Sequence, residues 1–213
     1  MAKFIDEIKA LYHDGKKLPL IEDFYTLQGE GFHMGRAAYF IRIGGCDIGC
    51  YWCDSKYSWR PDRDQLVDIE TLVEKASSYP AKAIVVTGGE PLNYNLNPLC
   101  NLMKSNGITT YLETTGAYEL SGQWDWICLS PKPNQPPKEE IIPLADELKV
   151  IIYEDSDFEF AEHYANKVKP GTHLFLQPEW SRHKENTPKI VEYIKENPKW
   201  RISIQAHKFM KIP

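Results

Sequence analysis

Seven short runs of β-branched and aromatic residues recur along the chain, and their spacing constrains the fold more than any other feature. The runs cover residues 37–43, 82–87, 108–114, 126–130, 147–153, 173–177 and 201–205. Helical periodicity appears between several of them, in residues 68–79, 97–106, 158–168 and 187–197. Strands that alternate with helices predict a parallel sheet. Only about ten residues separate the third run from the fourth, too few for a crossover helix. We therefore expect an α/β fold, a partial (incomplete) TIM-like barrel of parallel strands.

The length of the chain favours one domain. Its 213 residues are enough for one sizeable hydrophobic core. Only residues 130–143 resemble a linker, because their five prolines forbid a regular helix or a central strand. We predict a single domain over residues 1–213.

Glycine-rich, proline-rich and polar motifs follow several of the predicted strands. They are GGC at 44–46, TGGEP at 87–91, ETTG at 113–116, SPK at 130–132 and QPEW at 177–180. In parallel α/β folds, the carboxyl ends of the strands meet at one rim, and active sites are built there. We expect these motifs to gather in one mouth.

Three cysteines, Cys46, Cys50 and Cys53, lie within eight residues in the pattern CxxxCxxC. A structural zinc site and a closed iron–sulfur cluster each need four protein ligands. The nearest histidines, His33 upstream and His163 far downstream, lack the spacing of a zinc module. The pattern therefore favours a four-iron cluster whose fourth iron is open to a small ligand, with structural zinc as the alternative.

Composition and charge exclude several classes of protein. A net charge of −5 argues against a surface that coats nucleic acid or binds an anionic membrane. The polar amino-terminal stretch lacks the apolar run of a secretory signal, and the longest apolar runs are too short to span a bilayer. We expect a cytoplasmic protein, in which clustered thiols stay reduced and bind metal. Cys100 and Cys128 lie in apolar contexts and are predicted to be inert core residues.

Two motifs in order resemble a known superfamily. CxxxCxxC with Trp52 before its last cysteine resembles the signature of the radical S-adenosylmethionine superfamily, and TGGEP resembles its second motif. Within that superfamily, the chain is similar over nearly its whole length to the 7-carboxy-7-deazaguanine synthase (QueE) family. The motifs that carry this similarity are TLQGEG, FIRIGGC, CDS, TGGEP, LETTG, SPK, LQP and an ending at proline.

The resemblance implies a reaction and its cofactors. The family converts 6-carboxy-5,6,7,8-tetrahydropterin to 7-carboxy-7-deazaguanine by radical ring contraction with loss of ammonia. A 5′-deoxyadenosyl radical starts this reaction, which is of the carbon–nitrogen lyase type and serves queuosine (tRNA modification) and 7-deazapurine biosynthesis. The implied cofactors are a [4Fe–4S] cluster, S-adenosyl-L-methionine and Mg²⁺. The implied partners are a pterin substrate, an electron donor such as flavodoxin or ferredoxin, and a second copy of the chain, with no direct contact to nucleic acid or membrane.

The resemblance also assigns site residues. The three clustered cysteines would hold the cluster, and Ser55, where many relatives have threonine, would supply a hydroxyl to Mg²⁺. Contacts to S-adenosylmethionine are expected at Trp52, Asp54, Gly89, Glu90, Ser130, Pro131, Lys132, Gln177 and Pro178. Substrate contacts are expected at Leu27, Gln28, Gly29, Glu30, Arg42, Thr87, Glu113 and Pro213. No protein acid or base is assigned.

The chemistry of these side chains suits a carboxylated pterin. Arg42, four residues before Cys46, can fork onto a carboxylate beside the cluster. Glu113 can accept two N–H bonds from the guanidine-like edge of the pterin. A tail that ends at Pro213 and closes on the active site would add backbone polar groups and a free carboxylate.

Plainer roles stay open for several residues. Arg42 could pair with a nearby acid, Glu113 could be solvated, and Asp54 could cap the following turn. SPK and QPEW could be ordinary turns at strand ends, and His207 and Lys208 have no assigned role. Two other functions also stay open: a radical activase that acts on a glycine of a partner enzyme, and a non-enzymatic iron–sulfur or zinc module.

Overall fold

Nine strands of the described chain form one curved sheet. The computed structural model describes residues 14–61 and 65–213. The strand order is β3-β1-β2-β4-β5-β6-β7-β8-β9, and every pairing from β2 to β9 is parallel. The amino-terminal stretch that argues against a secretory signal lies outside the described residues up to position 13. Residues 62–64 of the predicted domain also lie outside them.

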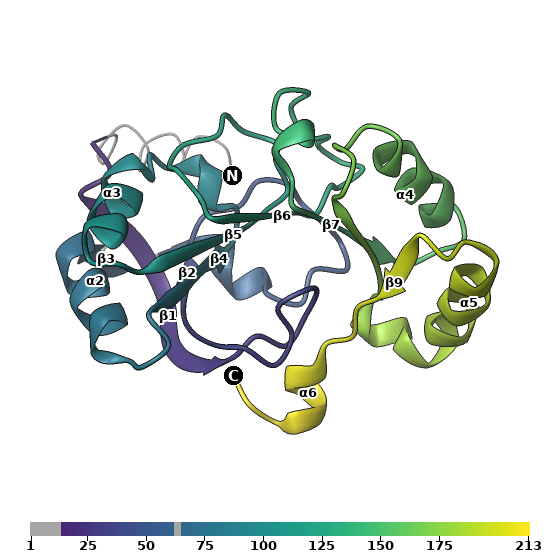
Figure 1. The fold of residues 1–213 in the computed structure, drawn as a ribbon, viewed down its shortest axis with the longest axis horizontal. Helices are drawn as coiled ribbons and strands as arrows, with labels where there is room; N and C mark the ends of the chain where they lie inside the picture. The colour runs from purple at the N-terminus through teal and green to yellow at the C-terminus, as the bar shows by residue number, and fades with distance from the viewer. Residues whose placement is uncertain (1–13, 62–64) are drawn as a thin grey trace.

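The parallel strands coincide with the seven predicted runs to within a few residues. They are β2 Ala37–Ile43, β4 Ala83–Gly88, β5 Thr109–Thr114, β6 Trp126–Leu129, β7 Glu147–Ile152, β8 His173–Pro178 and β9 Trp200–Ile202. As predicted, β5 and β6 are joined without a helix. The sheet does not close on itself in Figure 1, so the predicted incomplete barrel is confirmed.

Two antiparallel strands, which the sequence pattern did not reveal, extend the sheet beyond β2. They are β1, Lys17–Leu27, and β3, Leu66–Asp68. Most residues of β1 are only half buried, and Glu22 and Asp23 interrupt its apolar residues. A strand without a clean alternation of apolar and polar residues gives little periodic signal.

The predicted helices flank the two ends of the sheet. They are α2 Ile69–Ser78, α3 Asn97–Ser105, α4 Asp157–Ala165 and α5 His183–Glu196. Figure 1 shows α2 and α3 at the end of the sheet near β1, and α4 and α5 at the end near β9. Each helix buries an apolar stripe, such as Leu72 and Val73 of α2 or Leu99 and Met103 of α3. Burial of such stripes against the sheet stabilises short helices that would be marginal alone.

Helix α5 begins earlier than the sequence predicts. The helical periodicity of the sequence covers residues 187–197. In the structure α5 begins at His183 and contains Pro188 in its interior. The preceding 3₁₀ turn, Trp180–Arg182, runs directly into it. The prolines of residues 130–143 behave as expected, because this stretch holds only an isolated bridge and the 3₁₀ turn Ile142–Leu144.

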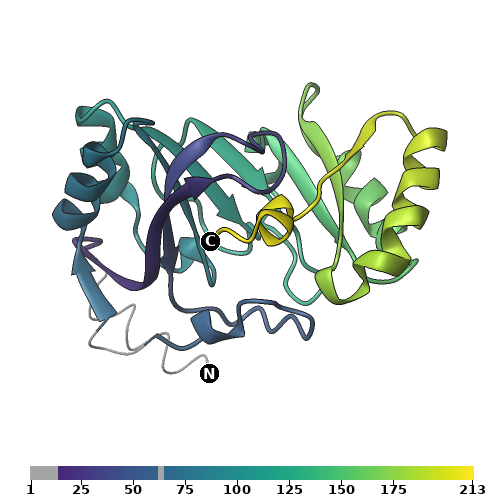
Figure 2. The ribbon, with the colours of Figure 1, turned by 90° about the horizontal axis from the view of Figure 1, so that it is seen from below.

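Two segments from distant parts of the chain meet across the open side of the barrel. One is the β1–β2 loop, residues 28–36, and the other is the tail, residues 203–213, which contains the short helix α6, Ala206–Met210. The amide of Ala206 donates to the carbonyl of Gly29 at 2.9 Å, and the amide of Gly31 donates to Oγ of Ser203 at 3.0 Å. Figure 2 shows α6 beside this loop, with the carboxyl terminus next to it. These contacts complete the wall that the missing strands of a full barrel would form.

No helix in the described part of the chain has both the length and the apolar character needed to cross a bilayer.

Candidate active site

A cavity of about 270 Å³, here called the main cavity, lies at the carboxyl rim of the parallel strands. All the predicted site residues except Pro131 line it. Pro131 is buried beside it, between Ser130 and Lys132, which do line the cavity. The motifs that follow separate strands in the sequence therefore come together in one site.

The three clustered cysteines lie in the cluster loop, residues 44–55, directly after β2. They are free thiols; Cys46 is buried and the other two are half buried. The loop is held by its own backbone, since the amide of Cys46 donates to the carbonyl of Trp59 and that of Cys53 to the carbonyl of Cys50. Asn134 also stabilises the loop, because its Nδ2 donates to the carbonyls of Ile48 and Gly49 at 3.2 and 3.0 Å.

The donor set fits a cluster better than a single metal ion. Among residues 14–61 and 65–213, no three Cys, His, Asp or Glu side chains converge on one point that could hold one ion. Three thiols around one cavity suit a cluster in which each of three irons takes one sulfur. Burial raises the pKa of Cys46 to about 12 and also raises the pKa of Cys50, so these thiols would lose their protons only on binding metal.

The TGGEP segment packs against the cluster loop at van der Waals distance. Gly88 has a φ of +142°, and a Cβ there would lie 2.1 Å from the carbonyl oxygen of Ile43. A Cβ on Gly89 would lie 2.4 Å from the carbonyl oxygen of Gly45 and 3.0 Å from Cβ of Cys46. Glycine is thus required at both positions for the end of β4 to reach the cluster loop.

Glu90 is fully buried, and protein donors surround its carboxylate. Oε1 accepts from the amide of Leu92 at 3.0 Å and from Oγ1 of Thr114 at 2.5 Å. Oε2 accepts from the amide and Oγ1 of Thr115 at 2.8 and 2.6 Å. A carboxylate offers about four lone-pair positions, and these donors occupy them. Glu90 therefore ties the end of β4 to the end of β5, and its contact with S-adenosylmethionine stays a prediction.

The residues predicted for the adenosine half of the cofactor lie at the ends of β6 and β8. The ammonium of Lys132 donates to the carbonyl and to Oγ of Ser130, at 2.6 and 2.7 Å, and lies 5.8 Å from the ring centre of Trp52. Burial lowers the pKa of Lys132. Oε1 of Gln177 accepts from Oγ of Ser203 at 2.6 Å, which ties the end of β8 to the tail.

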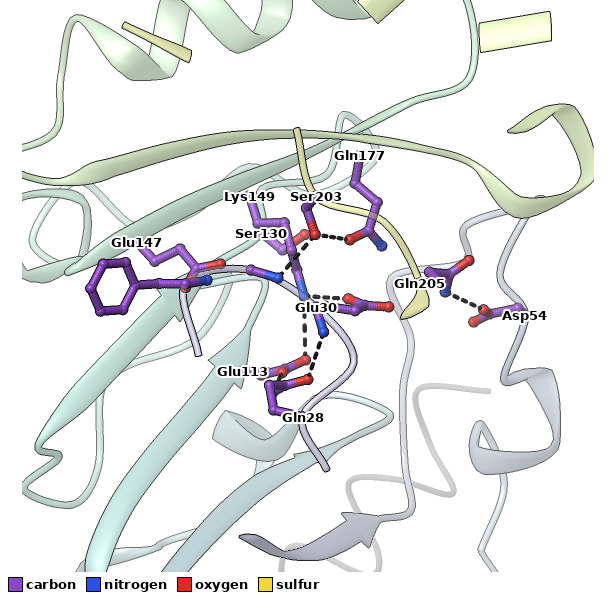
Figure 3. A network of polar contacts seen from close by, with 12 residues as sticks. Gln28, Glu30, Asp54, Glu113, Ser130, Glu147, Lys149, Gln177, Ser203 and Gln205 are labelled. Carbon is purple, nitrogen blue, oxygen red and sulfur yellow. Dashed lines mark hydrogen bonds and ion pairs between the residues drawn. The ribbon is translucent and has the colours of Figure 1, made fainter. Parts of the chain in front are cut away.

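A network of polar side chains joins the β1–β2 loop to β5 and β7 (Figure 3). Nε2 of Gln28 donates to Oε1 of Glu113 at 2.8 Å, and Nζ of Lys149 lies 3.6 Å from Oε2 of the same carboxylate. Lys149 also pairs with Glu30, with 2.5 Å between Nζ and Oε2. Figure 3 shows Lys149 between the two carboxylates. Glu113, Glu30 and Gln28, all predicted substrate contacts, are thus parts of one network.

Lys149 was not among the predicted site residues, although its side chain is only 6% exposed. Burial by itself lowers the pKa of an ammonium, but Glu113 and Glu30 outweigh it and raise the pKa of Lys149 well above its usual value. The pKa of Glu30 is lowered, because Lys149 outweighs the effect of burial on that carboxyl. Lys149 is therefore charged. A lysine within the otherwise apolar run of a central parallel strand was the available signal.

A second cavity, of about 340 Å³, shares Gln28, Glu30, Glu113 and Lys149 with the main cavity. Glu147 lines it and accepts from the amide of Phe32 and from Nε1 of Trp126, at 3.2 and 3.3 Å. Burial raises the pKa of Glu147. The charged network is therefore the wall that both cavities have in common.

Arg42 does pair with an acid, which is one of the roles left open for it. Its Nε lies 2.6 Å from Oε1 of Glu22, and Tyr57 donates to the same oxygen at 2.8 Å. These contacts use Nε, which leaves the two terminal nitrogens of the guanidinium for a ligand in the main cavity. The ion pair with Glu22 and a contact to the substrate carboxylate are therefore compatible.

Asp54 does not cap the turn that follows it. The residue before the 3₁₀ turn Lys56–Ser58 is Ser55, and no side chain caps the turn. Oδ2 of Asp54 instead accepts from Nζ of Lys208 at 2.7 Å and from Nε2 of Gln205 at 3.1 Å. Oγ of Ser55 lies 3.8 Å from Sγ of Cys53 and lines the main cavity.

The two remaining cysteines are buried, as predicted. Cys100 lies in α3, and burial raises its pKa to about 12. Burial also raises the pKa of Cys128 well above its usual value. Unlike Cys100, Cys128 lines both cavities.

The chain is similar to known proteins along most of its length. Residues 40–209 match the family model described as "Radical SAM superfamily". A 7-carboxy-7-deazaguanine synthase of Flavobacterium psychrophilum is 53% identical, over 97% of this chain and 98% of the relative. One of Synechocystis is 48% identical, over 91% of this chain and 93% of the relative.

A solved structure shares the fold. The crystal structure of QueE from Escherichia coli has a TM-score of 0.81 to this chain, with 29% sequence identity. The match covers 93% of this chain and 98% of the solved one. Both the sheet and its connections are therefore those of a known fold.

Proposed function

The chain belongs to the radical SAM superfamily and, within it, to the 7-carboxy-7-deazaguanine synthases, and on this premise we propose a reaction for its main cavity. The reaction is the ring contraction of 6-carboxy-5,6,7,8-tetrahydropterin to 7-carboxy-7-deazaguanine with loss of ammonia, which would make the chain a carbon–nitrogen lyase. One observation carries this proposal: a single cavity is lined both by the three clustered cysteines and by the charged residues expected to bind a carboxylated pterin.

The cofactors divide between two parts of the cavity. A [4Fe–4S] cluster and S-adenosylmethionine together supply a 5′-deoxyadenosyl radical when both are bound. Cys46, Cys50 and Cys53 would hold the cluster. Contacts to S-adenosylmethionine fall to Trp52, Asp54, Gly89, Glu90, Ser130, Pro131, Lys132, Gln177 and Pro178. Their places at the carboxyl ends of β4, β6 and β8 support this assignment for most of them.

Two of these cofactor assignments have less support than the others. Pro131 does not line the main cavity, so its role would be to hold Ser130 and Lys132 in place. Glu90 would have to give up one of its four protein donors to accept a bond from the cofactor's ammonium. For Mg²⁺, Ser55 would supply one hydroxyl oxygen, and water and substrate oxygens would complete the shell.

The substrate would lie between two charged groups. Arg42 would bind the pterin carboxylate through its terminal guanidinium nitrogens, held in orientation by Glu22. Glu113 would accept N–H bonds from the pyrimidine edge, with its own carboxylate oriented by Gln28 and supported by Lys149.

The remaining predicted substrate contacts surround this position. They are Leu27, Gly29, Glu30, Thr87 and Pro213.

The wider setting follows from the family. We propose that residues 1–213 form one radical SAM domain whose tail closes on the active site. The protein would act in the cytoplasm as a homodimer, would receive its electron from a flavodoxin or ferredoxin, and would serve queuosine biosynthesis.

The two other functions are not favoured. A radical activase acts on a partner protein and has no use for Arg42 and Glu113 in the wall of the main cavity. A non-enzymatic iron–sulfur or zinc module has no use for a cavity beside its metal.

The decisive experiment is anaerobic turnover without any partner protein. The reconstituted protein is incubated with the carboxytetrahydropterin, S-adenosylmethionine, Mg²⁺ and a reductant, and the products are identified by mass spectrometry. Arg42→Ala and Glu113→Ala should lose product but keep the cluster's visible absorbance. Arg201→Ala and Glu119→Ala, on exposed surface, are the matched controls. Full activity in both site variants would defeat the substrate assignment.

Electron paramagnetic resonance tests the cofactor assignment separately. The spectrum of the reduced cluster should change when S-adenosylmethionine is added, because the cofactor binds the open iron. An unchanged spectrum would support a metal centre without that cofactor.

A further inference from the structure

The tail touches three separate segments of the active site. Ala206 is bonded to Gly29 of the β1–β2 loop, and Lys208 and Gln205 are bonded to Asp54 of the cluster loop. The ammonium of Lys208 also lies 4.7 Å from the ring centre of Trp180, just after β8. Figure 3 shows Gln205 directed at Asp54 from the tail.

The contact with Asp54 is the densest of these. Both donors bind the same oxygen, Oδ2, at 2.7 Å for Lys208 and 3.1 Å for Gln205. Nζ of Lys208 also donates to Oε1 of Gln205 at 3.0 Å, so the three side chains form a closed triangle. The side chain of Lys208 is 21% exposed and that of Asp54 is 49% exposed. Solvent therefore weakens the pair only in part, and the two extra hydrogen bonds add geometric definition.

The position of Lys208 fixes where Pro213 lies. Pro213 lies five positions after Lys208, and the turn between them is compact. Lys211 adopts the left-handed conformation at φ 56°, and the amide of Ile212 donates back to the carbonyl of His207 at 3.2 Å. Pro213 and His207 both line the main cavity. A tail fixed at Lys208 therefore delivers two residues to the cavity wall.

We propose that Asp54 is a positioning residue that holds the tail, so that Pro213 and His207 complete the substrate side of the main cavity. Asp54 directly follows the cluster ligand Cys53, so the contact joins the cluster loop to the wall of the substrate site. The effect on substrate rests on the proposed function; the contact between loop and tail does not.

The first test measures the tail itself, without substrate. Hydrogen–deuterium exchange is followed by mass spectrometry on the anaerobically reconstituted full chain. Asp54→Asn and Lys208→Met should each speed exchange in residues 203–213 by about three- to tenfold, the range expected for loss of one partly exposed charged contact. Peptides from β5 and β7 should not change. Lys208→Arg should restore most of the protection.

The matched control breaks an ion pair elsewhere. Lys189 of α5 pairs with Asp155, not with a residue of the tail, at 2.7 Å, so Lys189→Met should leave exchange of the tail unchanged. The double variant Asp54→Asn with Lys208→Met should exchange no faster than the faster single variant, because both remove one shared contact. Fully additive effects would mean that the two residues act separately and would overturn the proposal.

The second test uses kinetics and cofactor binding. Lys208→Met, which removes the contact without changing a predicted cofactor residue, should raise the KM for the carboxytetrahydropterin while the Kd for S-adenosylmethionine stays the same. If Asp54→Asn leaves exchange of the tail unchanged, Asp54 does not hold the tail and the proposal is wrong. If the Asp54→Asn protein does not keep its cluster, Lys208→Met tests the same contact, because it removes the partner in the tail and leaves the cluster loop unchanged. If exchange changes as expected but no pterin is turned over, the proposed function fails while the contact stands.

Discussion

The ammonium of Lys149 lies 2.5 Å from a carboxylate oxygen of Glu30, although the two residues are 119 positions apart in the chain. Lys149 projects from β7, and Glu30 comes from the β1–β2 loop that crosses the open side of the barrel. The pair is largely buried, since the side chain of Lys149 is 6% exposed and that of Glu30 is 15% exposed. It therefore fastens the β1–β2 loop to β7 through a buried ion pair.

Removal of the lysine charge should destabilise the whole chain. Lys149→Met leaves two carboxylates near each other in a buried site, and breaking a buried ion pair from one side typically costs about 3–5 kcal/mol. Urea unfolding of the cluster-free protein measures this loss. Lys195→Met, which removes an exposed pair with Glu192, should cost less than about 1 kcal/mol. Equal losses in the two variants would show that the buried network adds nothing to stability.

The pH dependence of stability should change sign at this site. In the native chain the pKa of Glu30 is lowered, so its contribution is present above the unfolded value of 4.5 and is lost as the pH falls through the folded pKa. In Lys149→Met, burial without a cation should raise the pKa of Glu30 above that value. Acidification from pH 7 toward pH 5 should then protonate Glu30 in the variant and reduce its destabilisation. The difference in the free energy of unfolding between the variant and the native chain should therefore narrow. A gap of constant size, measured by urea unfolding, would contradict the assignment.

Replacing the carboxylate of Glu90 by an amide should destabilise the chain. All four of its hydrogen bonds are accepted from donors, so Glu90→Gln turns an NH₂ group toward a hydroxyl or an amide of Thr114, Thr115 or Leu92. A buried mismatch of this kind costs about 1–3 kcal/mol. Thermal unfolding should show a clearly lower Tm, whereas Glu119→Gln at an exposed position should leave the Tm unchanged. An unaltered Tm for Glu90→Gln would mean that the carboxylate is not engaged as described.

Gly88 should accept no side chain at all. Alanine there would place Cβ 2.1 Å from the backbone of β2, at a φ of +142°. Since the contact is with backbone rather than a flexible side chain, we expect a loss above about 4 kcal/mol or an insoluble product. Gly107 is the control: its φ is +66°, but open space surrounds it, so Gly107→Ala should cost only about 1–2 kcal/mol. The comparison separates steric clash from backbone strain in one pair of unfolding curves.

Local patterns in the sequence were sufficient for most of the fold. A parallel strand such as β4 or β7 is recognised by a short β-branched run, and the motif that follows it by glycine, proline or charge. Both signals lie within a few neighbouring residues, so they can be interpreted without knowledge of the tertiary structure. Strand β1 was not recognised, because its residues are mostly half buried and its apolar and polar residues do not alternate clearly.

The sequence by itself determined the parallel strands and the helices between them, where the three cysteines cluster and which motifs meet at one rim. Only the tertiary structure decided that Lys149 is the partner of Glu30, that Thr115 satisfies Glu90, and that Asp54 pairs with Lys208 from 154 positions away. The physical reason is range. Periodicity and turn chemistry act between neighbours along the chain, whereas an ion pair or a buried hydrogen bond depends on which segments the folded chain brings within about 3 Å of each other.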